Sequence, residues 1–203
     1  MTPLDTPAIA NLLRQTLAEG QEPFVIITSD SMAPLFRPGD QARIEAIPWQ
    51  SLHPGDILLV EAATDLLTHR LREIVTRQGV TYLRLRGDRP LDFDAPIPAE
   101  KLIGRATARR REGRLLPLRQ GMGRWLNVHL AGINGCESRL FAHATSPLPR
   151  SSRLIRRAFY IWAKIIVAVV AVFGSKKIVK NNQRTTESRQ PSTGNTLDPH
   201  DVS

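Results

Sequence analysis

The chain contains very little cysteine and lysine, and both shortages limit the chemistry open to it. Cys136 is the single cysteine among 203 residues, which excludes an internal disulfide and a metal cluster built from cysteines. The first 100 residues contain no lysine, so the basic side chains of this region are arginines. Aromatic residues make up only 5%, and none interrupts the densest basic stretch, residues 105–119, so we expect no nucleic acid as a partner.

The charge of the chain is strongly one-sided. Lys and Arg number 28 against 19 Asp and Glu, a formal net charge of +9. Two further basic runs, residues 150–157 and 175–180, flank the most apolar segment of the chain. Basic residues beside an apolar segment are typical of contact with anionic lipid headgroups, so we expect membrane lipid to be a partner.

Residues 1–20 are expected to form an amphipathic helix. Ile9, Leu12, Leu13 and Leu17 fall on one face at helical spacing. Thr6 is a candidate N-cap, and Gly20 is suited to the end of the helix. The segment has no long apolar core, so it is not a secretory signal, and we expect the folded part of the chain to face the cytoplasm.

Residues 21–111 switch to the pattern of short strands. The expected strands are residues 23–28, 41–47, 56–62, 66–75, 81–87 and 102–110. Pro-Gly-Asp turns and a Gln-Gly pair separate them, and several alternate apolar with polar residues, as half-buried strands do. The fold class is therefore mainly β, with a barrel or a sandwich both open.

The rest of the chain is expected to be helical and then polar. Residues 112–157 predict one or two amphipathic helices, interrupted around Gly132 and Gly135, and a linker at Pro147 and Pro149. Residues 158–174 carry a single charge, Lys164, and are expected to form a transmembrane helix. A helix in the membrane plane, or packed on the β-domain, is the alternative. Residues 175–203 are expected to be disordered, and truncation after residue 150 to leave a folded β-domain.

The chemistry centres on the sequence TSDSMAPLFRPGD, residues 28–40, where Ser31 follows an apolar strand. The simplest reading is a turn, but a serine hydroxyl becomes a nucleophile when a base accepts its proton. Lys101 is the only lysine near the strands, and it is expected to be exposed at a strand end. His69, inside an expected strand, is the better base. Asp88, Asp92 and Asp94 share one loop and could supply the carboxylate that orients it.

These segments, taken in order, resemble the signal peptidase I superfamily, which includes the self-cleaving domains of SOS-type repressors. The resemblance covers residues 23–110 and rests on SDSMAPLFRPGD, GDILLVE, LTHRL, LRGDRPLDFDAPI and KLIGRA. It implies a β-rich, partly open barrel with the serine at the edge of a peptide-binding groove. It also implies a serine endopeptidase that needs no metal and no cofactor.

The resemblance assigns roles to individual residues. Ser31, directly before Met32, matches the nucleophile, and Ser29 matches a hydroxyl that contributes to the oxyanion hole. His69 matches the base of those members that use histidine instead of lysine. Asp94, six residues after Asp88, matches their third catalytic member, whereas Asp88 matches an acid with a structural role.

Three positions depart from the family pattern near the site. Asp30 stands where the family usually has glycine, and Arg89 and Pro90 replace a common pair of asparagines. The sequence therefore predicts a membrane-associated endopeptidase with Ser31, His69 and Asp94 as its catalytic residues. The alternative is a repressor-type self-cleaving protein, or a membrane-anchored regulator that binds an extended peptide by strand addition without cleaving it.

Overall fold

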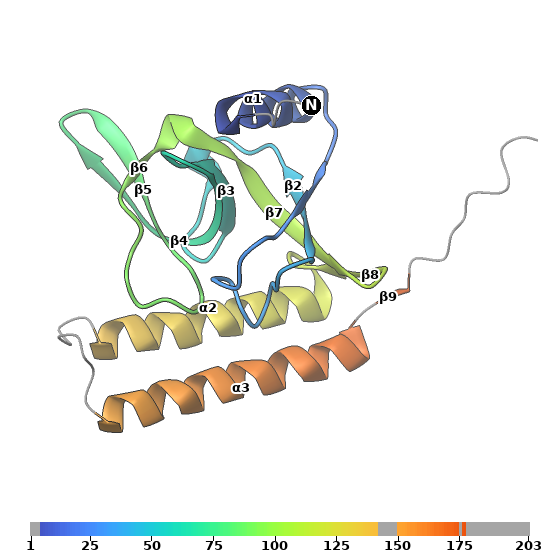
Figure 1. Ribbon diagram of the computed structural model, residues 1–203, viewed down its shortest axis with the longest axis vertical. Coiled ribbons are helices and arrows are strands. Elements are labelled where there is room, and N and C mark those ends of the chain that lie inside the picture. Colours follow the sequence, from blue (N-terminus) through green and yellow to red (C-terminus); the bar gives the residue numbers. More distant parts are fainter. Residues whose placement is uncertain (1–4, 142–149, 175, 178–203) are drawn as a thin grey trace, which may run out of the picture.

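The fold consists of an antiparallel sheet with one helix at one end and two helices at the other (Figure 1). The computed structural model describes residues 5–141, 150–174 and 176–177. The helices are α1 (Thr6–Ala18), α2 (Gly121–Phe141) and α3 (Arg150–Gly174), with short 3₁₀ turns at Trp49–Ser51 and Ala99–Lys101. The strands are β1 (Phe24–Ile26), β2 (Gln41–Glu45), β3 (Ile57–Glu61), β4 (Leu66–Arg77), β5 (Val80–Arg86), β6 (Ile97–Pro98), β7 (Leu102–Arg111), β8 (Arg114–Pro117) and β9 (Lys176–Lys177).

The strands follow the order β1-β2-β7-β3-β4-β5-β6, and β8 and β9 extend the sheet beside β7. Every pairing is antiparallel, and the sheet does not close within the described residues. This confirms the expectation of a mainly β fold with flanking helices. The six expected strands all form, whereas β6, β8 and β9, which have two to four residues each, were not predicted.

The turn between β4 and β5 illustrates how the local sequence sets the register of the sheet. Gln78 and Gly79 both have positive φ, 49° and 78°, which is the conformation of a two-residue hairpin turn whose twist matches its strands. Glycine adopts this backbone without cost, so the Gln-Gly pair fixes the register between the strands. Arg77 lies opposite Val80 as a result. Farther along β4 the register shifts by one residue between Leu71 and Glu73, and beyond this irregularity Arg70 lies opposite Arg86.

Two predictions about the helices need correction. The N-cap of α1 is Asp5, whose carboxylate accepts a hydrogen bond from the Ala8 N–H, and Thr6 is already the first helical residue. In addition, α2 runs without a break through Gly132 and Gly135. Each glycine costs about 1 kcal/mol in a helix, but burial of leucines on the inner face of α2 offsets this cost.

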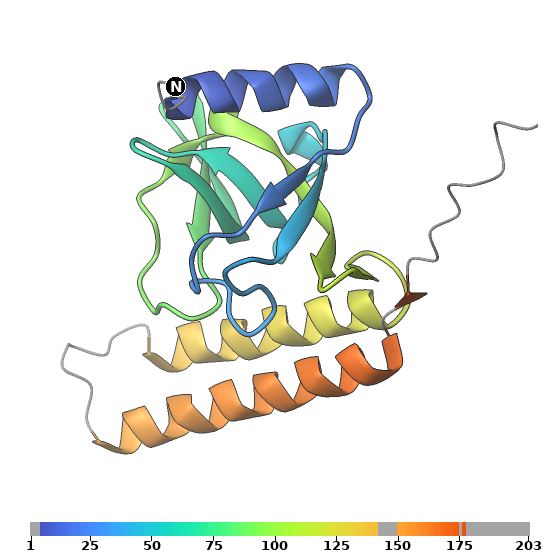
Figure 2. The ribbon, with the colours of Figure 1, turned by 45° about the vertical axis from the view of Figure 1, so that its right-hand side comes forward.

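The two C-terminal helices form successive layers over one end of the sheet. In both ribbon views α2 lies between the sheet and α3, so α3 is the outermost layer, and α1 lies at the opposite end (Figures 1 and 2). One hydrophobic core joins these layers. It includes Ile57 and Leu59 of β3, Leu126 of α2, and Ile166 and Val170 of α3.

Residues 158–174, expected to be a transmembrane helix, lie within α3. No helix in the described part of the chain is long and apolar enough to cross a membrane. The expected linker at Pro147 and Pro149, and most of the expected polar tail, fall outside the described residues.

Candidate active site

The loop between β1 and β2 carries the two serines, and it is anchored at both ends. The Ile27 N–H donates to the Asp40 carbonyl at 2.8 Å, and the Gly39 N–H donates to the Ile27 carbonyl at 2.9 Å. Between these points the side chains of Met32, Leu35 and Phe36 are buried in the core. Ser31 therefore lies partly exposed on a loop whose neighbouring residues are fixed by apolar packing.

Arginines of β7 support this loop from inside the fold. The Arg109 guanidinium donates to the Leu35 carbonyl at 2.8 Å, and burial lowers the pKa of Arg109 to about 10. Arg111 donates to both carboxylate oxygens of Asp40, at 2.7 and 2.6 Å. Much of the dense basic stretch is therefore structural, because these arginines hold the loop that carries Ser31 instead of forming a free surface.

Ser31, His69 and Asp94 form one chain of hydrogen bonds. His69 projects from β4, where it lies opposite Leu58 of β3, and its side chain is 6% exposed. Its Nε2 lies 2.8 Å from the Ser31 Oγ, and its Nδ1 lies 2.6 Å from an Asp94 carboxylate oxygen. An ionised carboxylate only accepts hydrogen bonds, so Nδ1 carries the proton and Nε2 is free to accept one from Ser31.

Asp94 is held in place by its own backbone, because its N–H donates to the Leu85 carbonyl of β5 at 3.0 Å. The loop that carries it also passes directly behind the nucleophile, where the Arg89 N–H donates to the Ser31 carbonyl at 2.9 Å. A Cβ on Gly87 would lie 2.8 Å from that same carbonyl oxygen. Glycine at this position therefore permits the two loops to approach closely.

The other expected site residues lie around this chain. The Ser29 Oγ is 3.0 Å from the Ser31 Oγ. Asp92 is exposed, and the two hydrogen bonds of His69 go to Ser31 and Asp94 instead. Asp30 and Arg89, two of the three departures from the family pattern, form an ion pair with each other beside Ser31. The negative charge next to the nucleophile is thus accompanied by a positive one from the facing loop.

Asp88 lies behind the site in a buried ion pair. Its two carboxylate oxygens accept from Nε and Nη2 of Arg70, both at 2.7 Å, and the side chains of this pair are 1% and 0% exposed. Asn134 of α2 donates to Asp88 at 2.6 Å, and Asn127 of α2 accepts from Arg70 at 2.6 Å. Since Arg70 directly follows His69, this pair fixes the end of β4 that carries the imidazole.

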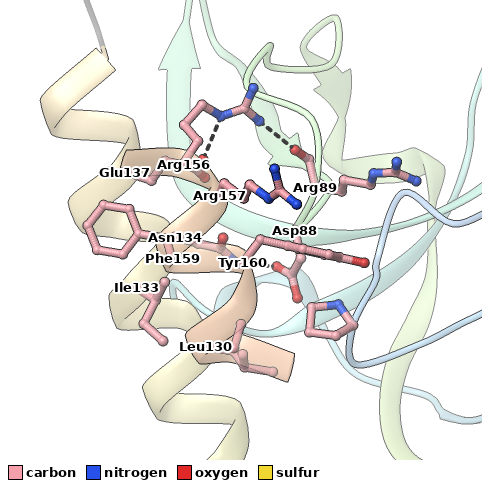
Figure 3. Close-up of a pocket in the computed structure, with 12 residues that line it drawn as sticks. Asp88, Arg89, Leu130, Ile133, Asn134, Glu137, Arg156, Arg157, Phe159 and Tyr160 are labelled. Carbon is pink, nitrogen blue, oxygen red and sulfur yellow. Dashed lines mark hydrogen bonds and ion pairs between the residues drawn. The ribbon is translucent and has the colours of Figure 1, made fainter. Parts of the chain in front are cut away.

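A second set of charges extends this network to α3. Arg86 donates to the Asn134 carbonyl at 3.1 Å, and burial lowers the pKa of Arg86. Glu137 of α2 accepts from Arg156 of α3 at 2.9 Å, and Arg156 also donates to the Arg89 carbonyl at 3.0 Å. Figure 3 shows Arg156 reaching from α3 toward both partners. Both helices are thereby tied to the loop behind Ser31.

A cavity of about 210 Å³ lies between this loop and the two helices (Figure 3). Its lining includes Pro34 of the serine loop, Asp88, Arg89, and Tyr160 of α3. The network around it was not predicted from the sequence. One signal in the sequence is that Asn127, Asn134 and Glu137 follow each other at spacings of seven and three residues, so these three polar side chains lie on one face of α2.

Among the described residues, no group of three or more His, Cys, Asp or Glu side chains could hold a metal ion. His53 lies in a turn, where its backbone N–H donates to Asp56, and His129 stacks on Trp125 of α2. Comparisons with protein-family models, with curated proteins and with solved structures found no match to this chain. The chemistry must therefore be argued from the geometry of the site.

Proposed function

We propose that the protein is a serine hydrolase in which Ser31 is the nucleophile, His69 the base and Asp94 the carboxylate that orients the base. The unbroken chain of hydrogen bonds from Asp94 through His69 to Ser31 carries this proposal. Within that class, the resemblance of the sequence to the signal peptidase I superfamily favours a serine endopeptidase of that type. We further propose that the antiparallel sheet corresponds to the partly open barrel of that superfamily.

In this mechanism the Ser31 Oγ attacks the carbonyl carbon of the scissile peptide bond while its proton passes to the Nε2 of His69. Asp94 stabilises the imidazolium that forms. The imidazolium then gives its proton to the departing amine, and the acyl group remains on Ser31 as an ester. Water, activated by the neutral imidazole, attacks this ester and regenerates the serine. Each proton taken by His69 is returned within one turnover.

The negative charge on the carbonyl oxygen needs hydrogen-bond donors that are already in place. We assign this role to the Ser29 hydroxyl and to the backbone N–H of Ser31, because Ser29 lies beside the attacking oxygen. Loss of one such donor costs about 3 to 4 kcal/mol in other serine hydrolases. Ser29→Ala should therefore lower kcat about a hundredfold or more while leaving Ser31 reactive.

An extended peptide has a place to bind next to the nucleophile. Within the described residues β1 pairs with β2 alone, so its other side offers backbone N–H and C=O groups to an added strand. The loop with Ser29 and Ser31 directly follows this strand. A peptide added to β1 would thus run toward Ser31, as an endopeptidase requires.

The proposal is tested by labelling the purified protein with a fluorophosphonate probe and by digesting a library of peptides, with cleavage read by mass spectrometry. We expect covalent labelling at Ser31, peptide cleavage by the wild type, and loss of both in Ser31→Ala. Ser29→Ala should still be labelled and should cleave slowly. Labelling that survives in Ser31→Ala would refute the assignment of the nucleophile, and labelling without any peptide cleavage would refute the endopeptidase.

A further inference from the structure

The two long faces of α3 lie in different environments. The inner face belongs to the hydrophobic core, where Ala163, Ile166, Val167 and Val170 are buried. Because α2 lies between the sheet and α3, the opposite face of α3 points away from the rest of the molecule (Figures 1 and 2). The inner face is thus occupied by protein, and only the opposite face is free to meet a partner.

This outer face is apolar. We define it by its large side chains Leu154, Ile161, Trp162, Ile165 and Val169, which are 48% to 68% exposed. Their spacings of four, seven and eleven residues place them on one side of the helix. A contiguous apolar surface on a folded monomer marks a site of interaction, because leaving it in water is unfavourable.

One border of the outer face is basic. Arg157 and Lys164 are exposed and lie seven residues apart, so they line the same edge of the helix. The Lys164 ammonium lies 5.6 Å from the centre of the Tyr160 ring, so its charge is held beside the apolar face and not over it. An apolar strip with a basic edge and an exposed tryptophan is the pattern of helices that lie in the interface of anionic membranes.

The charge pattern favours lipid over the other possible occupants. A second copy packed antiparallel on the same face would bring the Arg157 and Lys164 edges of two molecules side by side, where like charges oppose association. The C-terminal part of the chain also offers little to cover the face, because its large apolar side chains after β9 are limited to Ile178, Val179, Leu197 and Val202, and residues 181–196 contain none. Anionic headgroups, by contrast, complement the basic edge while the acyl chains accept the apolar strip.

We propose that the outer face of α3 docks the protein on an anionic lipid bilayer, with the helix lying in the membrane plane and its inner face still in the protein core. This inference does not depend on the proposed hydrolase activity, since it concerns a surface that none of the catalytic residues shares. It gives the expected lipid partner a defined binding surface.

The test is flotation of the full-length protein with vesicles of phosphatidylcholine alone or mixed in equal parts with phosphatidylglycerol. We expect flotation with the mixed vesicles and a marked decrease at high salt, because screening weakens the basic edge. Ile161→Ser with Ile165→Ser should weaken binding at least about tenfold, since each removes apolar area from the docked surface. Leu12→Ser is the control, because Leu12 lies on α1 at the far end of the molecule and is about as exposed (57%) as Ile161 and Ile165 (48% and 50%). This variant should float as the wild type does.

A second readout reports on the geometry of binding. In a protein whose other tryptophans, Trp49 and Trp125, are changed to Phe, Trp162 fluorescence should shift to the blue on adding mixed vesicles and be quenched by lipids brominated near the headgroup. Thermal unfolding of each variant in the absence of vesicles checks that it is folded. No flotation of the wild type, equal flotation of the Ile161→Ser, Ile165→Ser variant, or resistance of the bound protein to alkaline carbonate would each overturn the proposal. So would a wild-type dimer in solution that the same double substitution dissociates.

Discussion

Replacing Asp94 with asparagine tests the proposed mechanism most directly, because it removes one charge and almost no volume. The Asp94 carboxylate accepts the Nδ1 proton of His69 at 2.6 Å and so keeps Nε2 free to accept the proton of Ser31. An asparagine amide can turn its NH₂ toward Nδ1, which moves the imidazole proton to Nε2. In that tautomer the imidazole cannot take the proton from Ser31.

The expected loss can be estimated from a comparable substitution. The wrong tautomer lowers kcat by about 10⁴ in a serine triad, which is about 5 kcal/mol of transition-state stabilisation at about 1.36 kcal/mol for each factor of ten. The folded state should change little, because the side chain of Asp94 is 23% exposed and the backbone anchor to Leu85 remains. We therefore expect a protein with a Tm close to that of the wild type and almost no activity.

The assay is the rate of fluorophosphonate labelling, followed by kcat on a peptide that the wild type cleaves. Both should fall in Asp94→Asn, and combining it with His69→Ala should add little, because residues that act as one unit are not additive. The reasoning is refuted if Asp94→Asn keeps most of its activity while folded Asp88→Asn is inactive, because Asp88 would then be the third member.

Three further outcomes follow from contacts around the site. Asp88→Asn leaves the Arg70 charge buried without its partner and should lower the free energy of unfolding by about 3 to 5 kcal/mol in urea titrations, whereas exposed Asp92→Asn should change it by less than about 0.5 kcal/mol. Gly87→Ala places a Cβ 2.8 Å from the Ser31 carbonyl oxygen and from the Pro90 ring. The loop that carries Ser31 must then shift, so kcat should fall about a hundredfold. Unchanged kinetics would show that the two loops can separate without cost. Hydrogen bonds from Arg14 and, to a smaller extent, from Lys101 hold the pKa of Glu61 below its ordinary value of 4.5. The stability that this group contributes is therefore present above pH 4.5 and is lost on further acidification. Between neutral and acidic pH, Glu61→Gln should lose less free energy of unfolding than the wild type loses in urea titrations.

The strands could be predicted from the sequence because they depend on local patterns, whereas the site residues were proposed from their chemical types and from the resemblance to a known family. Alternation and turn pairs such as Gln78-Gly79 set the strands. Residue types left Asp88, Asp92 and Asp94 open as the partner of His69, and only the resemblance to a known family favoured Asp94. The structure brings Ser31, His69 and Asp94 within hydrogen-bonding distance. Whether these residues catalyse a reaction stays a prediction. Local patterns carry this information because neighbouring residues determine backbone conformation.

The support of the site could not be predicted, because it depends on contacts between distant segments. Arginine is usually exposed, so nothing in the sequence indicated that Arg70 and Arg86 are completely buried. Their burial becomes favourable only when Asp88 from one loop and Asn134 from α2 arrive from other parts of the chain. The pattern of one segment alone does not show which residue of another segment it will meet.

The packing of α3 also changes what truncation is expected to do. The sequence suggested that the β-domain would fold without residues beyond 150, because its core was expected to lie upstream. In the structure Ile166, Val167 and Val170 are buried in the same core as the sheet, and Arg156 bonds to the loop behind Ser31. Burying each such side chain contributes about 1.5 to 3 kcal/mol, so the three contribute about 5 to 9 kcal/mol, which is comparable to the whole stability of a typical domain. A chain ending at residue 149 should therefore unfold or aggregate, as judged by circular dichroism and size-exclusion chromatography, whereas full-length Leu154→Ser, changed on the outer face of α3, should keep the wild-type Tm. A truncated chain that is monomeric and unfolds at the wild-type Tm would show that α3 adds nothing to the core.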